Sequence, residues 1–504
     1  MASRVHQWIR LGLWSAVVIA GITAGAWAGE PFIDDGAEPP TNAYLADSPW
    51  PMSHRNPYNQ ASSPYPGPDG GETFSIDHSV GGVGPISINF SGPDYAGGQS
   101  AIWGANFFDV FKIIPQAGGG RVVRRFPDFP VGNLISGAYT VLDADENFFV
   151  PKGTQIRRYG ELFASDPNSQ IWPLANYYLP AEALGAGDSI VGLNLTYDGW
   201  LVLATAKGTV AVLARDFSEI RYVFLDTEPG EEVTNSIAVD EDGGIYVVTS
   251  QSVYRVQWDG ISLSTDPADG AWSAPYEPGP SVPAPGRLGT GSGTTPTLMG
   301  TGDDDKFVVI ADGQELMHIV LYWRDEIPVD WVPLPGKDPR IAAEMPITFG
   351  DPAATRSITE QSITVRGYDA MVVSNTYRNW PFSGGLFGLL VTFFSGNPLY
   401  QPFGVEKFQW DPVTRTLATA WANPDLSCPN GIPSMSAATG LAYCYGARGG
   451  QWTVEGIDWA TGAEVFHVFT GSTSFNSLYA ATEIGPGGSI ASGTVGGPLF
   501  LTPQ

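Results

Sequence analysis

Cysteine, histidine and positive charge are all scarce in this chain. Its 504 residues include two Cys and five His, and 25 Lys and Arg stand against 52 Asp and Glu, a net charge of −27. Cys428 and Cys444 form no Cys-x-x-Cys motif, which excludes a zinc site made of thiolates. Acidity of this degree repels nucleic acid and anionic membrane surfaces, so ligands that are neutral or cationic are favoured.

Several catalytic signatures are also missing. No Gly-x-Ser-x-Gly elbow and no phosphate-cradling Gly-Lys-Ser/Thr loop occurs, so neither an α/β-hydrolase nucleophile nor a nucleotide site is indicated. Asp143–Asn147 begins like a calcium loop, but Phe148 stands where that loop needs Gly, so a strand turn is expected. The histidines that follow the leader are not expected to converge on one metal: His54, His78, His318 and His467.

The first 28 residues have the features of a signal peptide. Arg4 and Arg10 form a basic segment, Leu11–Ile22 an apolar core, and Ala26–Ala28 a small-x-small cleavage site. We therefore expect residues 1–28 to be removed during export to the periplasm or beyond. The alternative, an uncleaved anchor, would need a longer apolar run, and no later stretch is apolar enough to span a bilayer.

Short β-branched and aromatic segments alternate with Gly- and Asp-rich turns along most of the chain. In residues 233–260, three such segments are separated by turns: Ile237–Val239, Ile245–Val248 and Val253–Trp258. Eight units of this kind can be counted, and the last has only three strands. We predict an all-β fold, a single β-propeller of eight blades (seven is the alternative), whose ring is closed by a strand from the N-terminal side.

The remaining segments are assigned around this ring. Residues 29–74 are rich in Pro, Ser, Asn and Tyr without periodicity, and we expect an extended arm on the surface of a propeller domain at 75–504. Pro- and Gly-rich stretches at 264–293 and 328–357 are expected to be ordered surface loops between blades.

Three segments of the chain resemble quinoprotein (pyrroloquinoline quinone)-like propellers. The arm carries Trp50, followed by Asn56 or Asn59, Gln60 and Ser62, at a spacing similar to the entry segment of that family. Residues 456–466, GIDWATGAEVF, and 410–421, WDPVTRTLATAW, look like its Asp-x-x-Thr-Gly repeat turns.

The resemblance carries a structural expectation for the first of these turns. Asp458 would accept backbone N–H groups, Gly462 would supply a positive φ, and Phe466 would pack between blades. The second copy departs from the pattern because Arg415 replaces the Gly. Members that hold the quinone commonly have adjacent cysteines, whereas Cys428 and Cys444 lie apart, so pyrroloquinoline quinone is not the expected cofactor.

A second resemblance concerns the ring axis. Residues 234–247, TNSIAVDEDGGIYV, are similar to blades of gluconolactonase- and paraoxonase-like propellers, where Asn and Glu side chains at the strand starts bind calcium. Aligning the units on the turn after the first strand places polar residues at comparable positions: Ser136, Asn235, Thr295, Gln361, Asn430, Asn476 and the adjacent Glu360. The candidate binding residues are therefore Asn235, Glu360, Gln361, Asn430 and Asn476, and all but Gln361 are candidate calcium ligands. The alternative is that these side chains bind channel water and cap strand ends.

The two cysteines suggest a disulfide, because an even number of cysteines in an exported chain is typical of one. We predict that Cys428 and Cys444 join the start of one blade's first strand to its second strand.

Two classes of function remain open. In the first, a small molecule or cation binds at the channel mouth, with metal-assisted hydrolysis or oxidoreduction as the chemistry. In the second, the protein is a non-catalytic binding or scaffold propeller, whose inserted loops grip a protein or saccharide partner. The sequence does not decide between an enzyme and a binding protein.

Cleavage after Ala28 is the first testable expectation, because the short apolar core followed by Ala-Trp-Ala matches the geometry that signal peptidase requires. N-terminal sequencing of the protein recovered from the exported fraction should begin at Gly29. A mature chain that still begins at Met1 would contradict it.

Overall fold

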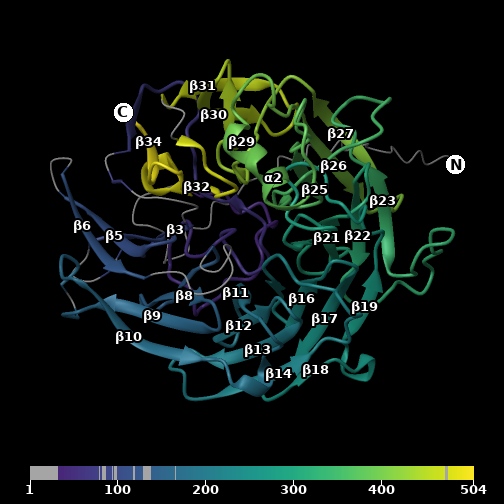
Figure 1. Ribbon diagram of the computed structural model, residues 1–504, viewed down its shortest axis with the longest axis horizontal. Helices are drawn as coiled ribbons and strands as arrows, with labels where there is room; N and C mark the ends of the chain where they lie inside the picture. Colours follow the sequence, from purple (N-terminus) through teal and green to yellow (C-terminus); the bar gives the residue numbers. More distant parts are fainter. Residues whose placement is uncertain are drawn as a thin grey trace, which may run out of the picture.

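Eight antiparallel sheets surround a central axis in the computed structural model (Figure 1). The structure describes residues 32–504, with gaps at residues 79, 82–86, 94, 96–98, 117–119, 129–137, 165 and 472–474. The signal peptide predicted for residues 1–28 and the candidate channel residue Ser136 lie outside the described residues. Within those residues, none of the helices is both long enough and apolar enough to span a bilayer.

Each blade runs from an innermost strand at the axis to an outermost strand at the rim. Blade 1 consists of β3 (Ser87–Phe90), β4 (Ile102–Ala105), β5 (Asp109–Pro115) and β6 (Arg121–Pro127), and blade 2 of β7 (Val141–Leu142), β8 (Phe148–Lys152), β9 (Gln155–Glu161) and β10 (Ile171–Tyr178). Blade 3 consists of β11 (Ile190–Leu195), β12 (Trp200–Thr205), β13 (Thr209–Ala214) and β14 (Ile220–Phe224). Blade 4 consists of β15 (Ala238–Val239), β16 (Gly244–Val248) and β17 (Ser252–Trp258), and both β18 (Leu263–Ser264) and β19 (Trp272–Pro275) pair with β17.

The second half of the ring repeats this order. Blade 5 consists of β20 (Thr297–Met299), β21 (Phe307–Ala311), β22 (His318–Trp323) and β23 (Ile341–Pro346), and blade 6 of β24 (Thr364–Arg366), β25 (Asp369–Val373), β26 (Val405–Asp411) and β27 (Thr416–Asn423). Blade 7 consists of β28 (Ser434–Ser436), β29 (Leu441–Arg448), β30 (Gln451–Asp458) and β31 (Glu464–Phe469). Blade 8 consists of β32 (Thr482–Gly485), β33 (Ser489–Ser492), β34 (Leu499–Pro503) and β2 (Phe74–Asp77). Short 3-10 turns lie at Ala181–Ala183 (η1), Pro267–Asp269 (η2) and Pro486–Gly488 (η5).

Ring closure follows the predicted arrangement. β2 pairs antiparallel with β34, so the strand from the N-terminal side becomes the outermost strand of blade 8. Eight blades and closure by this strand are therefore confirmed. Closure covers the edge of β34 that a three-stranded last blade would otherwise expose.

The arm that precedes β2 runs through the centre of the ring, and the expectation of a surface position is wrong for much of it (Figure 1). Trp50, Tyr58 and Ser62 are completely buried. Ser62–Ser63 form a short strand, β1, that pairs in parallel with β28. The reason is that the arm is bound through its backbone, which leaves no periodic pattern in the sequence.

Backbone carbonyls of the arm accept hydrogen bonds from the innermost part of seven blades. Six of these bonds come from backbone N–H groups, and in blade 3 the Asn194 side chain donates to Pro57 at 3.1 Å. The backbone pairs are Phe90 to Trp50, Leu142 to Pro51, Val239 to Pro57, Leu298 to Tyr58, Val365 to Gln60 and Met435 to Ala61, at 2.8–3.0 Å. The arm therefore satisfies strand edges that would otherwise face the channel.

The arm makes tight changes of direction to reach successive blades. Four of its residues other than glycine have positive φ, namely His54, Arg55, Asn59 and Ala61. Such conformations cost free energy for an L-residue and persist only where surrounding contacts hold them. Asn59 is held by its side chain, which donates to the carbonyls of Ile237 and Pro296 at 2.9 and 3.0 Å.

The turn at Asp458 has the geometry that the repeat resemblance implies. Asp458 Oδ1 accepts the N–H of Thr461 at 2.7 Å, and Gly462 has a φ of 73°. Phe466 stacks on Phe74 of the neighbouring blade 8, with ring centroids 5.6 Å apart. The related turn before β27 places Arg415 at a φ of 51°, where the pattern has Gly.

The disulfide prediction is confirmed. Cys428 precedes β28, the first strand of blade 7, and is bonded to Cys444 in β29, with their Cα atoms 5.8 Å apart. Both residues are buried in a cluster between blades 6 and 7.

The inserted segments carry more regular structure than expected. The predicted loop 264–293 contains η2 and β19, and the predicted loop 328–357 contains β23, so the assignment of both as loops throughout is wrong. A third insertion, which was not predicted, separates β25 from β26. It holds a short helix α2 (Gly385–Leu389) that continues into the 3-10 helix η3 (Leu390–Phe394).

Trp50→Ala tests whether the arm is part of the core. Trp50 is fully buried among residues of blades 1, 7 and 8, so its loss should destabilise the fold by about 3–5 kcal/mol. Denaturant unfolding should show a loss similar to that of Trp103→Ala, a fully buried tryptophan of β4. Ile33→Ala, at an exposed arm position, is the control and should change little. A Trp50→Ala protein as stable as wild type would mean that the Trp50 side chain contributes nothing to the core.

Candidate functional site

The candidate residues read from the sequence all lie at one end of the channel, where the innermost strands begin. Asn235, Glu360, Gln361, Asn430 and Asn476 are all buried, with exposed fractions between 0 and 6%. Polar atoms of all but Gln361 contact the backbone of two segments that cover this end. One is the loop 276–293, and the other is the segment 379–404 with α2 and η3, which we call the cap.

Asn235 and Gln361 bond to backbone carbonyls. The Asn235 side chain donates to Ser292 in the loop 276–293 at 3.0 Å, and that of Gln361 donates to Cys428 at 3.0 Å. Gln361 Oε1 is buried without a hydrogen-bond partner among the described residues. Asn235 therefore holds the loop 276–293, whereas Gln361 holds the residues that precede β28.

Glu360 forms a buried ion pair with Arg287. Its Oε1 lies 3.1 Å from Arg287 Nε, its Oε2 accepts the N–H of Leu288 at 3.1 Å, and the two side chains are 1% and 3% exposed. Burial raises the pKa of Glu360, while the Arg287 charge and the bond from Leu288 oppose that rise. Arg287 also donates to the carbonyl of Gly313 at 2.8 Å. The pair therefore fastens the loop 276–293 to the start of blade 6.

Asn430 and Asn476 come together beneath the cap. Asn430 Nδ2 lies 2.6 Å from Asn476 Oδ1, and both side-chain amides donate to the carbonyl of Thr392 at 2.7 Å. Asn430 also bonds to Ser395 Oγ at 2.7 Å, and its oxygen accepts from Tyr377 at 3.1 Å. These amides hold η3 in place over the channel.

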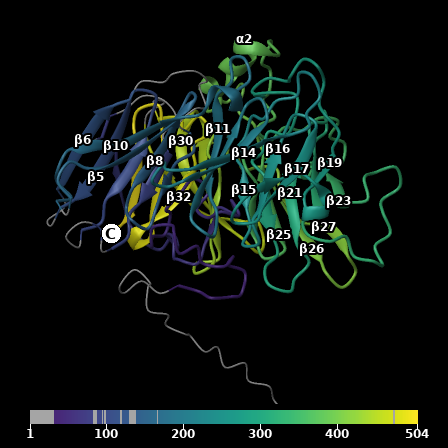
Figure 2. The same cartoon turned by 90° about the horizontal axis from the view of Figure 1, so that it is seen from below.

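The cap is built with its apolar side outward. Leu386, Phe387, Phe393 and Phe394 are 48–69% exposed. The side that faces the ring consists of smaller or polar residues, namely Gly388, Val391, Thr392 and Ser395. Figure 2 shows α2 standing above one end of the ring, on the side opposite the arm. A surface helix normally buries its apolar stripe, so this reversed pattern points to a docking surface.

Two titratable side chains, His54 and Glu483, are buried near the axis with atoms that have no hydrogen-bond partner among the described residues. Burial lowers the pKa of His54 to about 4, and both of its ring nitrogens are without hydrogen-bond partners in the described part of the chain. Burial raises the pKa of Glu483 well above its ordinary value, and only the N–H of Ile88 opposes this rise. Ordered water in the channel would satisfy such groups.

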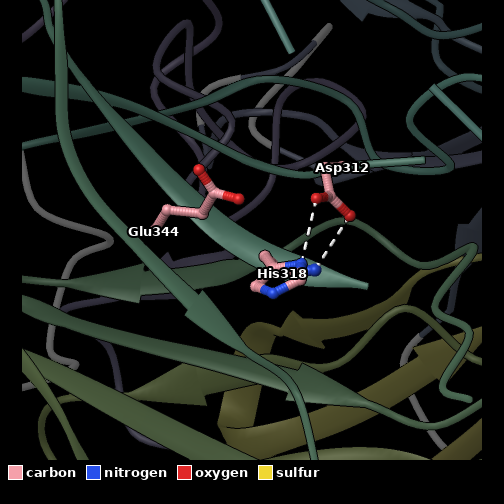
Figure 3. A group of neighbouring side chains, drawn as sticks. All are labelled: Asp312, His318 and Glu344. Carbon is pink, nitrogen blue, oxygen red and sulfur yellow. Dashed lines mark hydrogen bonds and ion pairs between the residues drawn. The ribbon is translucent and has the colours of Figure 1, made fainter. Parts of the chain in front are cut away.

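A cluster that the sequence analysis did not identify lies on blade 5. Figure 3 shows His318 facing Asp312, with Glu344 alongside. His318 Nδ1 is 3.2 Å from Asp312 Oδ2, and one ligand atom from each of the three residues lies within 4.8 Å of the others. Asp312 and Glu344 also line a cavity of 210 Å³. The three residues form no sequence motif, and they come together only because β21, β22 and β23 pair side by side in one sheet.

Neighbouring side chains already donate hydrogen bonds to the two carboxylates of this cluster. Gln314 Nε2 lies 2.7 Å from Asp312 Oδ2, and Lys337 Nζ lies 2.9 Å from Glu344 Oε1. An imidazole with two carboxylates is able to hold a divalent cation. It is equally able to form the hydrogen-bonded network that the structure shows.

No protein-family model matches the chain. Among solved structures, a streptogramin B lyase is 11% identical, with a TM-score of 0.40, over 86% of this chain and 98% of that chain. The periplasmic gluconolactonase PpgL of Pseudomonas aeruginosa is 13% identical, with a TM-score of 0.41, over 72% of this chain and 95% of that chain. Likenesses of this size carry no inference about activity.

A relative in Archaeoglobus fulgidus (strain ATCC 49558) is far more similar. It is described as an uncharacterized protein and is 42% identical over 492 residues, which span 92% of this chain and 89% of the relative. The chain therefore belongs to the same protein family as this Archaeoglobus fulgidus protein.

Proposed function

We propose that this protein is an exported, non-catalytic binding propeller that docks on an apolar partner surface through its cap. The observation that carries the proposal is the reversed polarity of α2 and η3, which expose leucine and phenylalanine at four positions and bury Gly388, Val391 and Thr392, followed by buried Ser395. Exposed apolar area of this kind is costly in water, and its usual reason in a stable protein is a partner.

The attachment of the cap supports a binding role. Asn430 and Asn476 fix the carbonyl of Thr392, and the backbone N–H of Gly286 bonds to the carbonyl of Gly388 in α2. A surface held in this way loses little conformational entropy when it binds. Export is supported by the leader-like residues 1–28 and by the Cys428–Cys444 disulfide, because disulfides persist in oxidising compartments.

Binding of calcium or a small molecule at the channel mouth is the rival proposal, with metal-assisted hydrolysis or oxidoreduction as its chemistry. It needs Glu360 as a ligand, because Glu360 is the one carboxylate among the five candidate residues. Both Glu360 oxygens already accept hydrogen bonds from Arg287 and Leu288. Their engagement favours a structural role.

Glu360→Gln separates the two roles. If Glu360 is a clamp, the variant leaves a buried guanidinium without its counter-charge and should lose about 3–5 kcal/mol of stability. The double variant Arg287→Met with Glu360→Met should recover most of that loss, because it removes both charges. Calorimetry should also show that calcium leaves the melting temperature of chelator-treated wild type unchanged. A calcium-dependent rise that Glu360→Gln abolishes would restore the rival proposal.

Docking through the cap can be followed with a single label. Both native cysteines are in the disulfide, so Leu386→Cys introduces one reactive thiol for an environment-sensitive fluorophore. On titration with a cell-envelope fraction, the probe should show a saturable blue shift as it leaves water. Val413→Cys is the matched control, since Val413 is 91% exposed in the turn between β26 and β27, at the opposite end of blade 6. Equal responses at the two positions, or none at residue 386, would refute the proposal.

A further inference from the structure

We infer that the surface on which the cap docks is a lipid bilayer with uncharged or zwitterionic headgroups, into whose interface the cap inserts. The inference rests on the proposed function, since it names the partner of the same surface. Three properties of the cap support it: the hydrogen bonds of its polar groups, its lack of charged residues and its projecting shape.

Side-chain donors at four positions of the cap are bonded to carbonyls of the cap itself, while Gln401 bonds to the carbonyl of Ala447 in β29. Four such bonds occur: Asn379 to Leu399 at 3.0 Å, Trp380 to Phe387 at 3.0 Å, Thr392 to Leu389 at 2.8 Å and Ser395 to Thr392 at 2.8 Å. A polar group that enters hydrocarbon without a partner costs several kcal/mol, so a segment that satisfies its own groups avoids this cost.

Part of the cap backbone is also hydrogen-bonded within the cap. The N–H of Gly388 bonds to the carbonyl of Gly384 at 3.0 Å, and that of Leu390 to the carbonyl of Leu386. These two helical bonds pair part of the backbone between Gly384 and Leu390, which lowers the cost of placing this part of the cap in lipid.

Charge separates the cap from the rest of the chain. Residues 379–405 contain no Asp, Glu, Lys or Arg, although the whole chain has a net charge of −27. Arg378 lies at the base, with its guanidinium over the Phe403 ring at 4.7 Å. An uncharged tip suits the acyl boundary, whereas the acidic body would be repelled by anionic headgroups.

The aromatic residues of the cap form a compact wedge. Trp380 stacks on Phe394, with centroids 5.7 Å apart, and meets Tyr400 edge-on at 5.0 Å. Phe382 and Leu399 add side chains that are 50% and 61% exposed. Because α2 lies beyond the end of the ring (Figure 2), the wedge can enter about 5–10 Å of interface while the acidic blades stay in water.

A protein partner fits these observations less well. Protein interfaces carry about one hydrogen bond per 100–200 Å² and a polar rim around their apolar centre. The bonded donors of the cap already face inward to its own carbonyls, and its exposed side chains are chiefly leucine and phenylalanine. Lipid makes no demand for hydrogen bonds, so it matches this surface better.

Flotation with protein-free phosphatidylcholine vesicles tests the inference on the purified full-length mature chain. Wild type should float with the vesicles, and it should bind phosphatidylglycerol vesicles more weakly because both carry negative charge. Leu386→Ser combined with Phe387→Ser should weaken binding about tenfold or more, since two large apolar side chains are lost. Val413→Ser is the control and should bind as wild type does. Both replaced cap residues are exposed, so unchanged melting temperatures should show that the fold is intact.

The outcomes separate the two proposals. Vesicle binding that the cap variant leaves unchanged would overturn the lipid inference. So would a wild type that fails to float although the probe at residue 386 responds to envelope fractions, and in that case the partner is a protein and the proposed function stands. If neither vesicles nor envelope fractions give a response, both proposals fail.

Discussion

The contact on which the rest of the structure depends is the one between the arm and the innermost strands. Around the axis of an eight-bladed ring, each innermost strand presents a backbone edge that has no neighbouring strand. Here arm carbonyls from Trp50 to Ala61 accept the N–H groups of six of these strands, and Asn194 adds a seventh contact. The arm is thereby an internal component, and its position fixes which end of the channel remains for other segments to cover.

At that other end, the polar residues that invite interpretation as a ligand site are used to fasten covering segments. Glu360 secures the loop 276–293 through Arg287, and Asn430 and Asn476 secure the cap through Thr392. The resemblance to calcium-binding propellers singled out residues that the structure brings to one end of the channel. What it could not supply is the partner of each side chain, because those partners come from insertions that the repeat does not contain.

The sequence allowed the blades, their closure and the disulfide to be predicted because each leaves a local or countable signal. Strand periodicity reveals units such as Ile245–Val248, and an incomplete last unit calls for the strand at Phe74–Asp77. The burial of the arm left no such signal, since Pro57 and Gln60 are bound through carbonyls that every residue possesses. The cap was not predicted because residues 379–404 form an insertion outside the strand repeat. The cluster of Asp312, His318 and Glu344 depends on the pairing of three strands, which spacing alone does not reveal.

The central position of the arm also governs the order in which the molecule can be completed. Tyr65, near the end of the arm, accepts a hydrogen bond from Ser436, 371 residues later in the chain. The arm, which is synthesised first, therefore completes its contacts only after blade 7 has been made. Contacts between such distant residues slow folding, because loop closure must precede any gain in binding energy. For a chain exported as proposed, slow completion keeps the polypeptide open long enough to cross a membrane as an extended thread.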